Sequence, residues 1–296
     1  MSLQATFQSM RPPFLVLTPA CVLLGIASAG LSEPTLSALP IVLALVGAVS
    51  AHISVNTFNE YFDFKSGLDA TTERTPFSGG SGSLVQTPAA ASWVLASAVI
   101  TLLLTVMIGL YFLISAGLAI VPIGLLGLVI IITYTSWLNR NPWLCLIAPG
   151  LSFGPLMVVG TQVALTGHLA TTALWLSLPP FFLVNNLLLM NQLPDIDADR
   201  AAGRHHFPIA YGVAASIRLF GLQLLAAGIA VVLLPTAVGL SYWSLLGLLP
   251  WLAGVASFMG ARQFGGQIEQ LLPAMGMNVA AAVVTPAVIA LALLLS

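Results

Sequence analysis

Long, uninterrupted apolar runs constrain the fold of this chain more than any other feature. Each run approaches the ~20 residues that a helix needs to cross the ~30 Å hydrocarbon layer of a bilayer. The mean hydropathy of +1.03 is far above that of a chain that could bury its apolar side chains in a soluble globule. The sequence therefore predicts an all-α, polytopic membrane protein. Nine spans are expected, at about 13–31, 38–62, 88–111, 114–134, 143–165, 173–193, 208–234, 242–261 and 271–295.

The positions of the basic residues predict how these spans are oriented. Lys and Arg collect in loops on the cytoplasmic side of a membrane protein. With nine spans, every second connection carries a basic residue, and the remaining loops carry none. We therefore expect a cytoplasmic N-terminus and an external C-terminus. The basic residues on the cytoplasmic side are Arg11, Lys65, Arg74, Arg140, Arg200, Arg204 and Arg262, with Arg218 inside the seventh span.

Composition excludes other classes of protein. The net charge of −1 excludes a strongly basic nucleic-acid binder, so no nucleic-acid partner is expected. Cys21 and Cys145 both lie in apolar runs and are predicted to be small core residues.

The stretch after Arg11 lacks a small-residue cleavage site and is expected to remain as the first span. Residues 1–296 are predicted to form a single transmembrane domain.

The second span carries a polar stripe. His52, Asn56, Asn59 and Asp63 are separated by four, three and four residues, and Glu60 lies four residues after Asn56. These intervals place the side chains on one face of a helix. Polar side chains inside a membrane helix are costly and usually functional, so this face is a candidate site.

The sixth span repeats this design. Asn185, Gln192, Asp195 and Asp199 are separated by seven, three and four residues, and Asn191 lies four residues before Asp195. Both stripes lead into loops on the same predicted side of the membrane. Seven of the nine acidic residues gather at these two places, namely Glu60, Asp63, Asp69, Glu73, Asp195, Asp197 and Asp199.

Opposed carboxylates at a membrane boundary would repel one another unless a cation lies between them. Oxygen ligands of this kind suit Mg²⁺, which commonly shares its coordination shell with phosphate oxygens. Lys65, Arg74, Arg200 and Arg204 would neutralise the remaining negative charge of such a ligand. A polar centre that holds a diphosphate, inside an apolar bundle that holds a hydrocarbon tail, describes a site for an isoprenyl diphosphate.

At these residues the chain resembles the UbiA superfamily of intramembrane prenyltransferases. The segment "NEYFDFKSGLD", 59–69, is similar to the first aspartate-rich motif of that family, and "DIDADRAAGR", 195–204, is similar to the second. The segment "FGPLMVVGT", 153–161, is closest to the branch that prenylates 1,4-dihydroxy-2-naphthoate for menaquinone. The resemblance implies nine membrane helices around a central cavity that opens to the cytoplasmic side.

The chain also departs from the family pattern. Glu60 stands where the family usually has Asp, and "HHF", 205–207, replaces a Thr-Leu pair after the second motif. A Gly-x-Gly-acid signature of the menaquinone branch is absent from "LCLIAPGLS", 144–152.

The resemblance implies Mg²⁺-dependent transfer of a prenyl group to an aromatic acceptor that is a quinone precursor. An intramembrane terpene cyclase and a transporter are the alternatives. Tyr61, Phe62, Tyr134 and Tyr211 are candidate aromatic faces for an allylic cation. The expected catalytic residues are Asn59, Asp63, Asp195 and Asp199, and the expected metal ligands are these four together with Glu60 and Asp69. The diphosphate is expected to bind Lys65, Arg74 and Arg204. The substrate cavity is expected to be lined by His52, Asn56, Tyr134, Asn185, Asn191 and Gln192.

Overall fold

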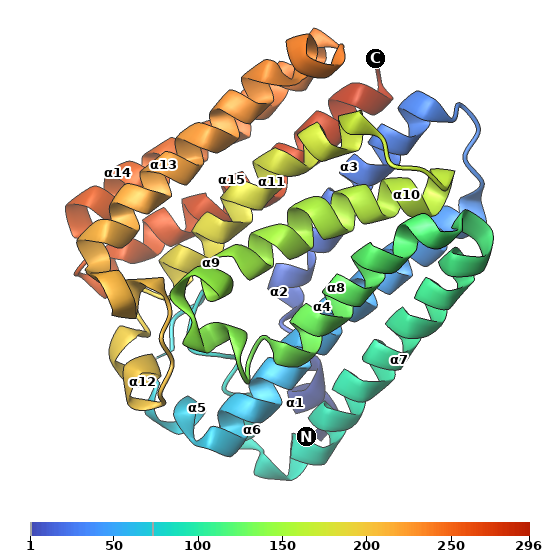
Figure 1. Cartoon of the computed structure of the whole chain (residues 1–296). Coiled ribbons are helices and arrows are strands. Elements are labelled where there is room, and N and C mark those ends of the chain that lie inside the picture. Colours follow the sequence, from blue (N-terminus) through green and yellow to red (C-terminus); the bar gives the residue numbers. More distant parts are fainter. Residues whose placement is uncertain (1, 73) are drawn as a thin grey trace.

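The computed structural model describes residues 2–72 and 74–296, and its regular elements are helical (Figure 1). Glu73, one of the acidic residues of the sequence pattern, lies outside the described residues. The first half comprises α1 (Ser2–Ser9), α2 (Pro12–Leu15), α3 (Leu17–Ser32), α4 (Ala38–Ser66), α5 (Leu68–Thr71), α6 (Ser83–Gln86), η1 (Pro88–Ala90), α7 (Ala91–Ala116), η2 (Leu118–Ile120), α8 (Val121–Thr133) and η3 (Leu138–Arg140). The second half comprises α9 (Pro142–Leu151), η4 (Ser152–Val159), α10 (Gly160–Thr166), α11 (Thr171–Asn191), α12 (Ile196–Ala201), α13 (Phe207–Val238), η5 (Tyr242–Gly247), α14 (Leu248–Phe264) and α15 (Ile268–Leu294).

The predicted all-α membrane architecture is confirmed, but the count of nine spans is not. Within the described residues, seven helices are long and apolar enough to cross a membrane. An eighth span results if Ser2–Leu15 and Leu17–Ser32, which meet at 44°, are counted together. The segment Leu118–Thr133 is shorter, so a ninth span stays a prediction.

Proline shapes the span that runs from α9 through η4 to α10. Pro149 and Pro155 lie inside it, and the stretch Ser152–Val159 is wound as a π-helix. Proline has no backbone N–H, so it interrupts the regular hydrogen-bond ladder of an α-helix. Asn141 begins the span, because its Oδ1 accepts from the backbone N–H groups of Trp143 and Leu144.

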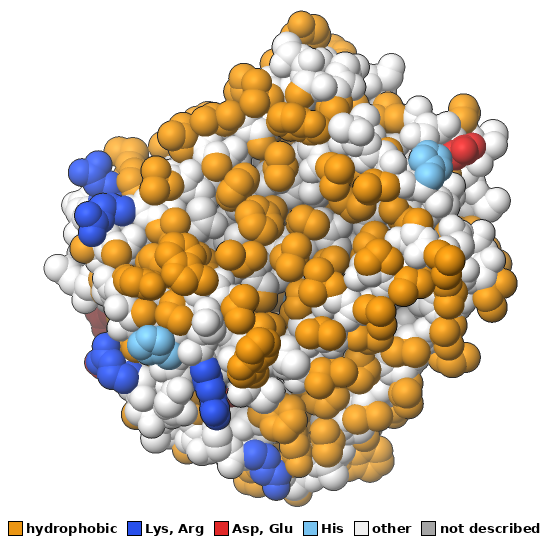
Figure 2. All heavy atoms as spheres, in the orientation of Figure 1, with side chains coloured by type: hydrophobic (Ala, Val, Ile, Leu, Met, Phe, Trp, Pro, Cys, Tyr) orange, Lys and Arg blue, Asp and Glu red, His pale blue; other side chains and the backbone are white. Residues whose placement is uncertain are grey.

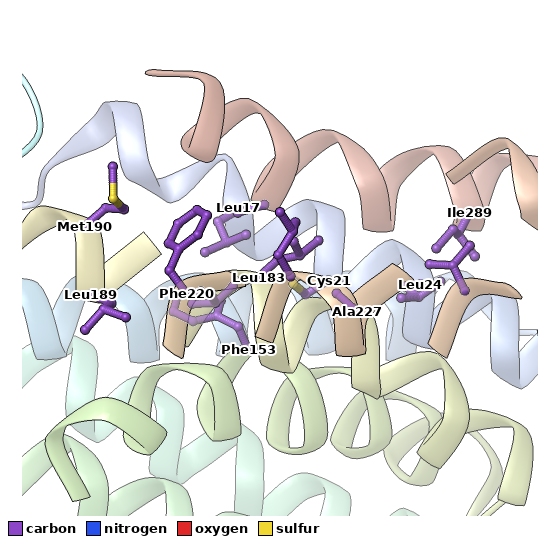
Figure 3. Packing of buried hydrophobic residues seen from close by; sticks show 14 of the residues in the cluster. Leu17, Cys21, Leu24, Phe153, Leu183, Leu189, Met190, Phe220, Ala227 and Ile289 are labelled. Atoms are coloured by element: carbon purple, nitrogen blue, oxygen red, sulfur yellow. The ribbon is translucent and has the colours of Figure 1, made fainter. Parts of the chain in front are cut away.

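The main core lies between α3, α11, α13 and α15, with η4 against α11 (Figure 3). Leu24 of α3, Leu183 of α11 and Ile289 of α15 are completely buried there. Cys21 also belongs to this core, as predicted. A continuous apolar core fixes these helices, and the short segments at their ends are positioned from them.

The short helices α5, α6 and α12 lie at one end of the bundle. In Figure 1, α5 and α12 lie at the lower left, where they pack against each other, and α6 lies at the bottom. On the face shown in Figure 2, the Lys and Arg side chains lie along the left and lower edge of the molecule. Apolar side chains cover much of the middle of that face, as expected for a surface in contact with lipid. The ends of α4 and α11, which carry the two polar stripes, point toward the end where the short elements gather.

Candidate active site

A cavity of about 230 Å³ lies between the ends of α4 and α11. It is the place where the two polar stripes meet. Most of the side chains predicted for the site line it, which supports reading the two stripes as one site. These are His52, Asn56, Asn59, Asp63, Asp69, Tyr134, Asn191, Gln192, Asp195, Asp199 and Arg204.

Arg204 joins the two acidic motifs. Its guanidinium pairs with Asp63 at the end of α4 and, at 2.9 Å, with Asp199 of α12. Gly203 precedes it with φ of 78°, a left-handed conformation that glycine adopts without strain and that turns the chain back toward the cavity. Burial lowers the pKa of Arg204, but the charges of Asp63 and Asp199 outweigh that effect and raise it. The guanidinium is therefore a permanent positive charge between the motifs.

The glycine-rich segment 78–82 closes one side of the cavity. The backbone N–H of Gly79 donates to Asp195 Oδ2 at 3.2 Å, and that of Ser81 donates to Glu60 Oε1 at 2.8 Å. Gly79 and Gly80 have φ values of 79° and 72°, which side chains rarely tolerate. The glycines thus let the backbone bridge both acidic motifs.

Arg11 is a cavity residue that the sequence did not single out. Its Nε donates to Glu60 Oε1 at 2.8 Å, and its Nη2 lies 3.4 Å from Asn59 Oδ1. Its φ of 54° is the one positive φ of a non-glycine residue in the described chain. Such strained backbone often marks a functional position. A lone arginine directly before a proline and an apolar span was the available signal.

Glu60 has a different place from the one predicted. Both of its carboxylate oxygens already accept hydrogen bonds, from Arg11 and from the backbone and hydroxyl of Ser81. It is 1% exposed and does not line the cavity. In the structure Glu60 therefore holds Arg11 and the glycine-rich segment, and its role as a metal ligand stays a prediction.

Three other predicted residues lie outside the cavity wall. Asn185 is buried, and its Oδ1 accepts from the Gly150 backbone N–H at 2.8 Å, so it joins α11 to α9. Lys65 and Arg74 are exposed. The Lys65 ammonium lies 5.8 Å from the centre of the Tyr61 ring, and Arg74 donates to the Asp69 carbonyl at 3.2 Å.

The aromatic wall also differs from expectation. Of the four candidate aromatic residues, only Tyr134 lines the cavity. Phe62 and Tyr211 are 42% and 51% exposed, and Tyr61 packs under the N-terminal helix. The other rings in the wall are Phe14, Phe77 and Phe153. Cys145, predicted as a core residue, is buried and also lines the cavity.

A second, apolar cavity of about 360 Å³ adjoins the first. It runs between α4, α7, α8 and the η4–α10 span, and several glycines widen it. Gly109 and Gly124 have nothing within 4 Å of the position of a Cβ atom. The two cavities share His52, Val55, Ile130, Ser152 and Phe153. A polar cavity thus lies directly beside an apolar one.

Comparison with known proteins agrees with this geometry. The chain matches the UbiA prenyltransferase family over residues 16–280. It belongs to that family. This UbiA family member is thus a prenyltransferase and an integral membrane protein.

Individual relatives support the assignment. The UbiA family member is 28% identical over 243 residues to the 1,4-dihydroxy-2-naphthoate octaprenyltransferase of Bacillus subtilis (strain 168), covering 81% of this chain and 76% of that one. Its fold is similar to a UbiA homologue from Aeropyrum pernix K1, with TM-score 0.70 and 16% identity over 91% of this chain and 95% of that one. It is also similar to a UbiA homologue from Archaeoglobus fulgidus solved with DMAPP and Mg²⁺, with TM-score 0.64 and 14% identity over 95% and 98% of the two chains.

The residues present fit a divalent cation that shares its shell with a ligand. Asp69 Oδ2 and Asp195 Oδ1 are buried and have no hydrogen-bond partner. Both carboxylates line the cavity, and oxygen ligands are those that Mg²⁺ prefers. Within residues 2–72 and 74–296, no three Asp, Glu, His or Cys side chains converge into a metal site by themselves. Asp69 and Asp195 are therefore the residues whose oxygens are unpartnered and of the type that a divalent cation binds.

Two carboxyl groups outside the spans have unusually high pKa values. Burial, together with the charges of Glu60 and Asp63, raises the pKa of Asp69 from 3.8 to about 7. Burial, together with the charge of Asp199, raises the pKa of Asp195 from 3.8 to about 7. In both cases burial is the largest cause of the raised pKa, and neighbouring carboxylates add to it.

These pKa values predict how pH changes stability. Between about pH 4 and 7 the folded, metal-free protein binds more protons than the unfolded chain, so acidification favours folding. We expect the melting temperature of metal-free protein in detergent to rise as pH falls from 8 to 5. Because Mg²⁺ needs ionised carboxylates, the increase in melting temperature on adding Mg²⁺ should be larger at pH 8 than at pH 5. The Asp69→Asn/Asp195→Asn double variant should lose most of both trends; unchanged trends in that variant would contradict the assignment.

Proposed function

We propose that this family member transfers a prenyl group from an isoprenyl diphosphate to an aromatic quinone precursor, with Mg²⁺, inside the bilayer. The reaction would serve menaquinone or related lipid-quinone biosynthesis. The single observation that carries the proposal is the junction of the two cavities. An acidic cavity suited to a metal diphosphate lies next to an apolar cavity suited to a hydrocarbon tail, and the two share five wall residues.

The relatives support both substrates. The Bacillus subtilis relative is a 1,4-dihydroxy-2-naphthoate octaprenyltransferase, which supports a dihydroxynaphthoate as the acceptor. Archaeoglobus fulgidus homologues were solved with DMAPP and with GPP, each together with Mg²⁺, which supports an isoprenyl diphosphate as the donor. The lipid bilayer is the third partner, since the apolar cavity lies among membrane helices.

The acidic chamber would bind the diphosphate and stabilise it as a leaving group. Asn59, Asp63, Asp69, Asp195 and Asp199 would hold the cation, which when bound supplies a Lewis acid for the departing diphosphate. Arg204 and Arg11 line the same chamber and would place fixed positive charge beside the oxygens on which negative charge develops. Lys65 and Arg74 would act from the rim, where their exposed side chains meet an entering substrate.

The wall near the junction would protect the allylic cation. Heterolysis of the C–O bond leaves the electron pair on the diphosphate and positive charge on the prenyl carbon. Phe153, which lines both cavities, and Tyr134, which lines the acidic one, would offer aromatic faces, and the apolar wall would exclude water that could capture the cation. An electron-rich carbon of the acceptor would then form the new C–C bond and would lose its proton, or carbon dioxide where it carries the carboxyl group, which restores the aromatic ring.

The active site would face the cytoplasm, in a single domain that spans residues 1–296. The basic residues of alternate connections support this orientation. The cavity lies at the end of the bundle where those connections gather, and soluble diphosphate substrate would enter there.

Pyrophosphate release by the purified protein tests the proposal. Reactions contain GPP or a longer isoprenyl diphosphate, with and without Mg²⁺, and with 1,4-dihydroxy-2-naphthoate, 4-hydroxybenzoate or no acceptor. We expect Mg²⁺-dependent release that requires the naphthoate and yields the prenylated product. Acceptor-free release of a hydrocarbon would instead establish a terpene cyclase. No release with any donor, combined with Mg²⁺-independent flux in vesicles, would favour transport.

A further inference from the structure

Three buried polar side chains of the cavity wall have an atom without a hydrogen-bond partner. They are Asn139, Gln192 and His206, which are 7%, 7% and 1% exposed. The unpartnered atoms are Asn139 Oδ1, Gln192 Oε1 and His206 Nδ1. All three residues line the acidic cavity. Buried polar atoms in native proteins nearly always find a partner in the protein, in water or in a ligand. The two amide oxygens can only accept, so their partner must supply hydrogen-bond donors.

Asn139 is held so that its oxygen is the free atom. Its Nδ2 donates to the Thr135 carbonyl at 2.7 Å, which fixes the orientation of the amide. Its own carbonyl accepts from the His205 backbone N–H at 3.0 Å. This bond ties η3, which carries Asn139, to the segment that presents Arg204 and His206. Asn139 Oδ1 can therefore only accept a hydrogen bond.

Gln192 offers a second acceptor in the same wall. Its Nε2 donates to Cys145 Sγ at 3.2 Å, which leaves Oε1 without a partner. His206 completes the group, because its Nε2 lies 2.9 Å from Asp199 Oδ2 and its Nδ1 has no partner. This histidine belongs to the "HHF" segment in which the sequence departs from the family motif.

The diphosphate cannot satisfy the two amide oxygens, Asn139 Oδ1 and Gln192 Oε1. Its oxygens, like those of the carboxylates, are hydrogen-bond acceptors, and two acceptors facing one another repel. The prenyl chain has no donor either. The remaining substrate, a hydroxylated aromatic ring, brings O–H donors that match acceptor atoms in the wall.

We propose that Asn139 and Gln192 form a hydrogen-bond-accepting subsite that binds the hydroxyl groups of the aromatic acceptor, with His206 beside them. The proposal rests on the proposed function and adds the chemistry by which the acceptor is chosen. A ring with two hydroxyl groups satisfies two wall oxygens, while a ring with one leaves a buried oxygen unpaired. Sites of this kind reject analogues that lack a hydroxyl.

Ligand analogues combined with wall variants test the subsite. Dissociation constants are measured for 1,4-dihydroxy-2-naphthoate, 1-hydroxy-2-naphthoate and 4-hydroxy-2-naphthoate, in detergent, with Mg²⁺ and inorganic pyrophosphate present. Wild type should bind each monohydroxy analogue about tenfold more weakly than the diol. Asn139→Leu and Gln192→Met should each remove that preference for one of the two hydroxyl groups, because the oxygen that recognised it is gone.

Asn278→Leu is the matched control. Asn278 is buried in α15, has an unpartnered Oδ1 and donates from Nδ2 to a backbone carbonyl, but it does not line the cavity. It should keep the full preference for the diol.

The other outcomes separate this proposal from the proposed function. If wild type transfers prenyl groups to the naphthoate but both wall variants keep the tenfold preference, the subsite is wrong and the transferase stands. If the variants instead raise only the Mg²⁺ concentration needed for half-maximal turnover, the wall oxygens face metal-bound water and the subsite is again wrong. If wild type neither binds nor prenylates any hydroxylated aromatic compound, both proposals fall.

Discussion

Asp195→Asn is expected to lower the rate of prenyl transfer by at least about 10²–10³-fold while the protein stays folded. Asp195 Oδ2 accepts a hydrogen bond from the Gly79 backbone N–H at 3.2 Å, and an asparagine oxygen can accept the same bond. Its other oxygen is buried without a partner, so the substitution breaks no ion pair. Burial and the charge of Asp199 raise the pKa of Asp195 to about 7, so removal of the charge should not weaken the metal-free fold. What is lost is a negative ligand for Mg²⁺.

The measurement is single-turnover product formation with GPP, naphthoate and a titration of Mg²⁺. Asp197→Asn is the matched control, since Asp197 lies two residues away, has a side chain that is 96% exposed and pairs only with Arg200 at the surface. We expect the control to keep wild-type turnover. Wild-type turnover in Asp195→Asn, at any Mg²⁺ concentration, would remove Asp195 from the metal site.

Helical spacing was enough to predict most of the acidic cavity. Asp63 and Asn59 share a face of α4, and Asp199 and Asp195 follow α11, so intervals of three and four residues identify them without any tertiary information. That these faces meet follows from the cost of polar side chains in lipid. The contact partner of each side chain cannot be predicted in the same way. Helical periodicity gives the face of the helix on which a residue lies, but not which residue lies opposite it.

Glu60 and Asn185 illustrate this limit. Both lie at the right period, yet Glu60 is held by Arg11 and Ser81, and Asn185 is held by the backbone of Gly150. Arg11 and Asn139 reach the cavity from short segments that connect helices. Their positions depend on how α1, α2 and η3 fold back, and no local pattern encodes that.

The count of spans was limited by irregular backbone. The hydropathy of residues 114–134 predicts one continuous apolar helix. In the structure Gly117, with φ of 84°, interrupts the helix, and α8 has only 13 residues. The first run bends at Val16, between α2 and α3. Apolar composition predicts that a segment avoids water, whereas its crossing of the bilayer depends on a straight length that composition does not fix.

Arg204→Gln is expected to lower the free energy of unfolding by about 3–5 kcal/mol and to abolish transfer. The guanidinium pairs with both Asp63 and Asp199, whose side chains are 10% and 5% exposed. Glutamine fills part of the space but leaves two buried carboxylates of different motifs without a cation between them. Their repulsion should separate the ends of α4 and α12, so the variant loses stability and the shape of the diphosphate site together.

Mg²⁺ distinguishes this electrostatic role from simple packing. In Arg204→Gln, a high Mg²⁺ concentration should recover much of the lost melting temperature, because a divalent ion can take the place between the carboxylates. Prenyl transfer should stay low, because the fixed positive charge of Arg204 beside the leaving group is missing. Arg200→Gln is the matched control: Arg200 is exposed and pairs with Asp197 at the surface, so its loss should change stability by about 0.5 kcal/mol at most. If Arg204→Gln melts like wild type without Mg²⁺, Arg204 does not hold the two motifs together. If its melting temperature falls but Mg²⁺ restores none of it, the loss arises from packing and not from unbalanced charge.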